Sequence, residues 1–208
     1  MELKWLGHSC FRITQDGYSI VIDPFEPGSV PGLSDIHETA NAVLCTHDHH
    51  DHNWVQGVTL TDGGESPFTI DALETFHDPQ GGALRGRNTI YILSHGGVRI
   101  AHLGDLGCEL SDEQVKSLGR LDAVLCPVGG FYTIDARQAY ELVRRLDVGV
   151  VVPMHYRSES FGFDVIGPVE DFTSLFPASQ VEAAESDAVS LSGGEGFRVV
   201  VLRYDSGA

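Results

Sequence analysis

The sequence contains no run of about 18 uncharged apolar residues, which is the length that a helix needs to cross a bilayer. Its first residues, MELKWLGHSCFRI, carry acidic and basic side chains before any apolar stretch, unlike a secretory signal. We therefore expect a soluble, cytoplasmic protein that does not associate with membranes.

Basic side chains are scarce. The chain has 13 Lys and Arg against 30 Asp and Glu, which gives a formal net charge of −17 and an isoelectric point near 4.7. Such a surface repels polyanions, and no basic stripe is present that could follow a nucleic acid backbone. We expect no nucleic acid partner.

Cysteine is also rare, and the pattern CxxC is absent. Cys10, Cys45, Cys108 and Cys126 are scattered next to apolar runs, which predicts buried, reduced thiols. Cys108 directly follows the segment GDLG, residues 104–107, and a thiol close to a bound metal ion is the alternative there. The nucleophile elbow GxSxG and a Ser-His-Asp arrangement are missing too, so an acyl-enzyme route has no candidate residues.

The order of elements predicts a layered α/β fold. A length of 208 residues with 42% hydrophobic residues fits a single domain over 1–208. Strands come first, and strands then alternate with helices, which indicates two sheets packed face to face with helices outside, an αββα sandwich. Strands are predicted at 3–6, 10–14, 18–23, 41–46, 68–76, 88–94, 98–104, 122–128, 148–155 and 198–204, and helices at 110–121, 133–147 and 168–176.

The segment THDHHDH, residues 46–52, is the strongest chemical signal. His47 and His49 are two residues apart at the end of a strand, so an extended backbone points both side chains the same way. Asp51 and His52 follow where we expect the chain to turn into a short helix at HNWV, so they can hold a second ion nearby. We expect the His50 side chain to face solvent or to contact a metal ligand without binding the metal itself.

Two later segments supply further donors. Asp105 lies in a Gly-Asp-Leu-Gly turn after a strand, where a carboxylate can project from a tight backbone. His155 follows the apolar strand VGVVVPM, which places its imidazole at the edge of a sheet.

These motifs resemble a known family. THDHHDH, HLGDLG and PMHY are similar, in this order, to the H-x-H-x-D-H signature and the later aspartate and histidine motifs of the metallo-β-lactamase fold hydrolases. LGHSCFRI, HDPQGGALRGRNTIYI and IAHLGDLG look most like the branch that contains the ascorbate-6-phosphate lactonase-like proteins. The resemblance implies a four-layer αββα sandwich of two mixed β-sheets flanked by helices, and a metal-dependent hydrolase.

Carried over residue by residue, the resemblance implies two metal sites that share a carboxylate. His47, His49 and His77 would hold the first ion, Asp51, His52 and His155 the second, and Asp105 would bridge them. His95 and His102 compete with His77 as the third histidine ligand. We interpret His102 as a core histidine or a neighbour of the ligands, and His95 as part of an exposed hairpin turn.

His8 ends the first predicted strand, in LGHSC, and could approach the metals from the side. Its simplest interpretation is a hydrogen-bonded histidine at a strand end. The alternatives are a group that supports the ligands, an additional ligand, or a catalytic proton donor to the leaving group.

Two divalent ions would activate a bridging hydroxide, which Asp51 and Asp105 would orient as catalytic residues. Imidazole and carboxylate donors without thiolate favour zinc, with manganese, iron, cobalt or nickel as alternatives. We expect the hydrolysis of an ester, lactone or phosphoester bond in a small molecule, with an anionic substrate as one option. The alternatives are a nuclease or phosphodiesterase of the same fold, and a metal-binding or sensing protein without turnover.

Several residues are candidates for substrate contact. Arg85 and Arg87 lie in a Gly-rich loop after His77 and could pair with a phosphate or carboxylate. Tyr132 and Tyr156 follow predicted strands whose ends face the metals, although either ring could simply be packed. The sequence leaves homo-oligomer formation open.

Overall fold

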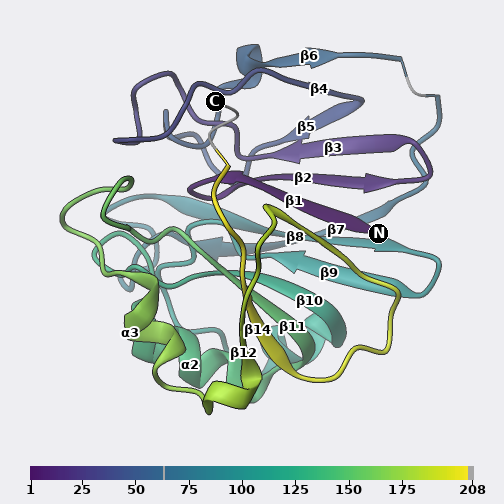
Figure 1. The fold of residues 1–208 in the computed structure, drawn as a ribbon. Coiled ribbons are helices and arrows are strands. Elements are labelled where there is room, and N and C mark those ends of the chain that lie inside the picture. Colours follow the sequence, from purple (N-terminus) through teal and green to yellow (C-terminus); the bar gives the residue numbers. More distant parts are fainter. Residues whose placement is uncertain (63, 206–208) are drawn as a thin grey trace.

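The computed structural model describes residues 1–62 and 64–205, and it arranges them as two β-sheets packed face to face (Figure 1). The smaller sheet has the strand order β13 (Ala188–Ser190), β1 (Glu2–Gly7), β2 (Cys10–Gln15), β3 (Tyr18–Ile22) and β5 (Ala42–Leu44). Its pairs are antiparallel from β13 to β3, and β5 runs parallel to β3.

The smaller sheet is buried on both faces at the end of β3, where successive residues belong to different apolar clusters. Ile20 and Ile22 belong to the main core, whereas Val21 between them belongs to a second apolar cluster. That cluster includes Ala40 of β4 (Glu38–Ala40) and Val58 of β6 (Val58–Leu60), a pair of strands outside this sheet (Figure 1), and the 3₁₀ helix η1 (Val55–Gly57) leads into β6. The helix that we expected at HNWV therefore begins only at Val55, as a single 3₁₀ turn.

The larger sheet has the order β12 (Val181–Ala183), β14 (Arg198–Val201), β11 (Asp147–Met154), β10 (Arg120–Pro127), β9 (Val98–His102), β8 (Arg87–His95) and β7 (Thr69–Phe76). Its pairs are parallel from β12 to β9 and antiparallel from β9 to β7. Every residue of β10 and β11 after the first is buried, as expected for central parallel strands that are covered on both sides.

Helices cover the outer face of the larger sheet, and Figure 1 shows α2 (Ala136–Arg145) and α3 (Val169–Thr173) on the side away from β1–β3. An ion pair of 2.8 Å between Arg145 and Asp112 ties α1 (Asp112–Leu118) to α2. Capping boxes begin both helices, from Ser111 to Gln114 in α1 and from Asp135 to Gln138 in α2. A 3₁₀ turn, η2 (Ala178–Gln180), leads into β12.

This arrangement confirms the predicted αββα architecture of two mixed sheets flanked by helices. The strands β1, β3, β5, β7, β9 and β11 all run in one direction within their sheets, so their carboxyl ends meet at one edge of the sandwich. Among the described residues, no helix has the length and apolar character that a membrane crossing requires.

Candidate metal centre

The residues with metal-binding chemistry lie directly after the carboxyl ends of these strands. They are His8 after β1, Asp23 after β3, 46–52 after β5, His77 after β7, Asp105 after β9 and His155 after β11. Segments from all along the chain therefore bring their polar side chains to a common edge, which is where open α/β sheets place their sites.

Asp105 is the centre of this cluster. Its side chain is buried, and its Oδ2 lies 3.2 Å from His52 Nε2 and from His155 Nε2. The same oxygen lies 3.4 Å from His77 Nε2 and 4.0 Å from His47 Nε2. A single carboxylate oxygen thus faces imidazoles from several separate segments.

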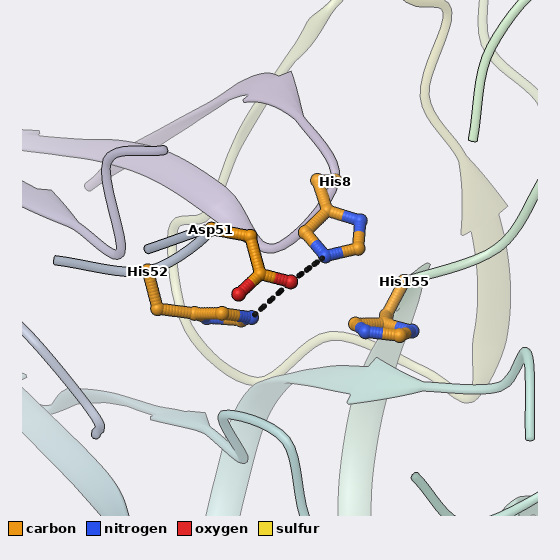
Figure 2. Close-up of side chains that lie close together, drawn as sticks. All are labelled: His8, Asp51, His52 and His155. Carbon is orange, nitrogen blue, oxygen red and sulfur yellow. Dashed lines mark ion pairs between the residues drawn. The ribbon is translucent and has the colours of Figure 1, made fainter. Parts of the chain in front are cut away.

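The donors form overlapping groups, because His47, His52 and Asp105 make up a group that shares residues with two others. His47, His49 and His77 form one group, and His8, Asp51, His52 and His155 form another, with the donor atoms of each group within 4.8 Å of one another. Figure 2 shows His8, Asp51, His52 and His155 converging on a common space. The structure therefore brings together all seven residues that the resemblance assigned to metal binding, and it places His8, the possible additional ligand, among them.

The geometry separates His77 from its competitors. His102 donates from Nε2 to the Ser9 carbonyl at 2.8 Å and accepts from the Gly104 N–H at Nδ1, so both of its ring nitrogens are used. His95 lies at a hairpin and contacts Asp16 at 3.1 Å. Only His77 of these three histidines joins a donor group within the part of the chain that the structure describes.

The chemistry of these donors fits divalent metal ions. The buried Nε2 atoms of His8, His47, His52 and His155 have no hydrogen-bond partner among the described residues, which is costly unless something else binds them. Ligands at about 2.0–2.2 Å from one ion are about 3.0–3.5 Å apart, close to the separations around Asp105. No cysteine belongs to a donor group in the described chain, so the site is one of imidazole and carboxylate.

Burial also keeps several imidazoles neutral, which is the form that binds metals. Desolvation, aided by the neighbouring His155, lowers the pKa of His8 to about 4. Desolvation likewise lowers the pKa of His47 to about 3 and that of His77 to about 4. At neutral pH these side chains therefore offer lone pairs.

The carboxylates of the site remain ionised. Burial alone would raise the pKa of Asp105, but the His155 and His52 rings beside it hold that pKa well below its usual range. Asp51 behaves in the same way, because its contacts with His8 and His52 outweigh desolvation and lower its pKa. For His52, desolvation is outweighed by the charges of Asp105 and Asp23, which raise its pKa. These acids thus favour positive charge at the centre of the cluster.

Asp23 is a functional residue that the sequence analysis missed. Its buried Oδ1 accepts from the Thr46 N–H at 2.7 Å, while Oδ2 accepts from Thr46 Oγ1 at 2.7 Å and from His52 Nδ1 at 2.9 Å. The Nδ1–H bond turns the Nε2 lone pair of His52 toward Asp105. An acid at the end of the strand YSIVID was the available signal.

Asn88 is a second missed residue, and it holds the loop of Asp105. The buried amide donates to Thr75 Oγ1 at 2.8 Å and to the Leu103 carbonyl at 2.9 Å, and its oxygen accepts from the Asp105 N–H at 2.9 Å. Gly104 has a positive φ of 56°, and a Cβ there would lie 2.3 Å from the Asn88 amide oxygen. The first glycine of the GDLG motif is therefore required by this close approach.

Asp78 organises the loop beside the first donor group. Its carboxylate accepts from the backbone N–H groups of Gln80, Gly82, Leu84 and Arg85 at 2.7–3.1 Å. The loop places Arg85 with its guanidinium 5.6 Å from the centre of the Tyr132 ring.

The other predicted substrate contacts take different positions. Arg85 and Arg87 both border a hollow of about 260 Å³ that Thr46, His47, Asp48 and His49 also line. Arg87, however, is exposed and pairs with Glu74 at 3.4 Å. The Tyr156 ring is buried against Trp5 and Phe161, as expected for the alternative that this ring is packed. Tyr132 remains beside the metal residues, with its ring centre 6.4 Å from that of His155.

Comparisons with known proteins agree with this geometry. A profile of the β-lactamase superfamily domain matches residues 2–155. A UPF0173 metal-dependent hydrolase of Methanoculleus marisnigri is 30% identical over 188 residues, which cover 75% of this chain and 81% of the relative. A second one, from Methanoregula boonei, is 29% identical over 190 residues, covering 76% and 83%.

A solved structure extends the similarity to nearly the whole chain. It is a protein of the metallo-β-lactamase superfamily from Thermotoga maritima, with 31% identity, a TM-score of 0.76 and coverage of 98% of this chain and 99% of that one. The profile match and the identity to the relatives show the family, and the cluster of imidazoles and carboxylates at one sheet edge is consistent with it. The chain therefore belongs to the metallo-β-lactamase superfamily of metal-dependent hydrolases.

Proposed function

We propose that this protein is a dinuclear metal-dependent hydrolase that cleaves an ester, lactone or phosphoester bond in a small anionic molecule. The observation that carries the proposal is the position of Asp105 Oδ2, which lies 3.2–4.0 Å from Nε2 of two histidines of the first donor group, His47 and His77, and of two histidines of the second, His52 and His155. A carboxylate placed in this way is suited to bridge two ions.

Each ion would have its own set of side chains. His47, His49 and His77 would hold the first, Asp51, His52 and His155 the second, and Asp105 both. Zinc is our first choice for these donors, with manganese, iron, cobalt and nickel as alternatives. When bound, two such ions would lower the pKa of a water molecule and polarise the oxygen of the scissile bond.

The chain itself would orient the reactants. Asp51 is ionised and its side chain keeps 16% exposure, so its carboxylate can accept a hydrogen bond from a water molecule at the open side of the site. Asp105 is almost fully buried and would orient the same water from within. No serine nucleophile is required, in agreement with the absence of an elbow motif.

The position of Arg85 favours an anionic substrate. Its side chain is half-buried and borders the hollow of the first donor group, and the Tyr132 ring beneath the guanidinium restricts its position. An arginine held in this way can form paired hydrogen bonds with a phosphate or carboxylate.

The first experiment measures metal content together with hydrolysis. We expect the wild-type protein to bind two equivalents of zinc and Asp105→Asn to bind at most one. Asp48→Asn, a change in the same histidine segment at an exposed carboxylate outside the donor groups, should keep both ions. If Asp105→Asn retained two ions and full activity, the bridging role would be wrong.

The second experiment compares matched ester, lactone and phosphodiester substrates, each in an anionic and a neutral form. We expect Arg85→Ala to raise KM for the anionic form and to leave KM for the neutral form unchanged. An equal effect on both forms would contradict the anion contact. If the loaded protein hydrolysed none of these substrates, a metal-binding protein without turnover would become the better description.

A further inference from the structure

His8 has an unusual environment for a histidine at the end of a strand. It follows β1 directly, its backbone is in the left-handed region with φ of 52°, and its side chain has no exposed surface. The pairing of β1 with β2 shifts register between Trp5 and Gly7, just before His8. Such an irregularity can change the direction of the side chain that follows it.

The backbone of His8 is held firmly, whereas its ring is not hydrogen-bonded. The carbonyl accepts from Trp5 Nε1 at 2.9 Å and from the His155 N–H at 3.3 Å. Neither Nδ1 nor Nε2 has a hydrogen-bond partner in the described parts of the chain. Burying two polar nitrogens in this way costs free energy, and a bound ligand would remove at least part of that cost.

The ring points at the second donor group. His8 Nε2 lies 3.5 Å from Asp51 Oδ2, and the rings of His8 and His155 are 4.2 Å apart between centres. Figure 2 shows the Asp51 carboxylate between His8 and His52, with His155 facing the same space. The 3.5 Å separation is too long for a good hydrogen bond, but it suits two donors that share one ion.

We propose that His8 is a further ligand of the second ion. This inference rests on the proposed function, because it requires an ion between Asp51, His52 and His155. His8 would bring the protein donors of that ion to five, counting Asp105, whereas the first ion would have four. The two sites would then differ, and the second would favour a metal that accepts five or six ligands, such as manganese, iron, cobalt or nickel.

The test substitutes His8→Asn. Asparagine tolerates the left-handed backbone, but its side chain is too short to replace the imidazole. We expect one cobalt(II) ion to bind more than about 100-fold more weakly, because even the loss of a supporting residue costs about 10- to 100-fold. The visible spectrum of that ion should gain intensity as its coordination number falls, while the other ion keeps its affinity and spectrum.

His95→Asn is the matched control, since His95 is at a hairpin and outside the donor groups of the described chain. It should leave both ions unchanged. An unchanged spectrum in folded His8→Asn would overturn the proposal even if affinity fell, because a residue that only supports a ligand does not alter coordination number. If the wild type bound a single ion, the proposed dinuclear function would fail, while the same comparison would still decide whether His8 binds that ion.

A second measurement needs no variant. In the cobalt-loaded wild type, each ligating imidazole gives one exchangeable, hyperfine-shifted N–H signal in proton NMR. His47, His49, His52, His77 and His155 would account for five such signals, and His8 would add a sixth. Five signals would refute ligation by His8.

Discussion

A change at Asp23 tests the proposed metal centre, because Asp23 is hydrogen-bonded to His52, a proposed metal ligand, without being a ligand itself. The change is Asp23→Asn, which keeps the size and the left-handed backbone of the residue, whose φ is 54°. In the native protein the fully buried carboxylate accepts three hydrogen bonds, from Thr46 N, Thr46 Oγ1 and His52 Nδ1.

The expected effect follows from the positions of the two carboxylate oxygens. Oδ1 accepts from the Thr46 N–H, so the amide oxygen of asparagine must take that place. The amide NH₂ then faces His52 Nδ1, which has to accept a hydrogen bond, and the ring proton moves to Nε2. That nitrogen lies 3.2 Å from Asp105 and is the one that would bind metal. We expect a loss of about 10- to 100-fold in the affinity for one ion, or about 1.4–2.7 kcal/mol.

The assay is a competition titration against a chromophoric chelator, with folding checked by circular dichroism. Asp16→Asn is the matched control, because Asp16 also has a left-handed backbone, with φ of 51°, and its exposed side chain contacts a histidine, His95, at 3.1 Å. The control should bind both ions as the wild type does. If Asp23→Asn also did so, the argument that Asp23 sets the tautomer of His52 would be refuted.

Three further predictions concern the structure around the site. Asn88→Ala should lower the free energy of unfolding by at least about 2 kcal/mol, measured in urea, because it leaves buried polar partners such as the Asp105 N–H unpaired. Phe11→Ala should cost about 3–5 kcal/mol in the same assay, whereas Leu84→Ala, at a residue that is 60% exposed, should change stability by less than about 0.5 kcal/mol. Burial lowers the pKa of His102 from 6.5, so the unfolded chain binds a proton that the folded state excludes, and the stability of the metal-free protein should fall as pH drops through about 6.5. In His102→Gln this part of the pH dependence should be absent, and an unchanged slope would contradict the assignment.

The longer strands were predictable because their signal is local. The β-branched residues 20–22 and the apolar runs in 123–126 and 148–154 are signals carried by neighbouring residues, and the structure contains the three strands predicted there at 18–23, 122–128 and 148–155. The three-residue strands β4, β6, β12 and β13 were not predicted. Each is too short to show a period, and its pairing depends on partners that are distant in the sequence.

The residues of the site also differ in how well the sequence could predict them. The histidine segment at 46–52 was recognisable because its donors are consecutive, and the resemblance to a family added His77. Asp23 and Asn88 were missed because their partners lie elsewhere in the chain, 29 residues away for His52 and 17 for Asp105. A single acid or amide near a strand end is common in any sequence. Only the fold shows which of these side chains contact a proposed metal ligand.

The distribution of strain indicates why the site lies at this edge and not within the sheets. His8, Asp23 and His155 all have a positive φ of 52–54°, which costs of the order of 1–3 kcal/mol at a residue other than glycine. All three come immediately after a strand, where the backbone no longer has to satisfy a ladder of hydrogen bonds. Unpaired imidazole nitrogens are concentrated at the same edge, whereas β10 and β11 are buried and regularly paired. The sheets must therefore supply the stability that this edge lacks, and an ion bound there would stabilise the part of the molecule that the protein alone leaves least satisfied.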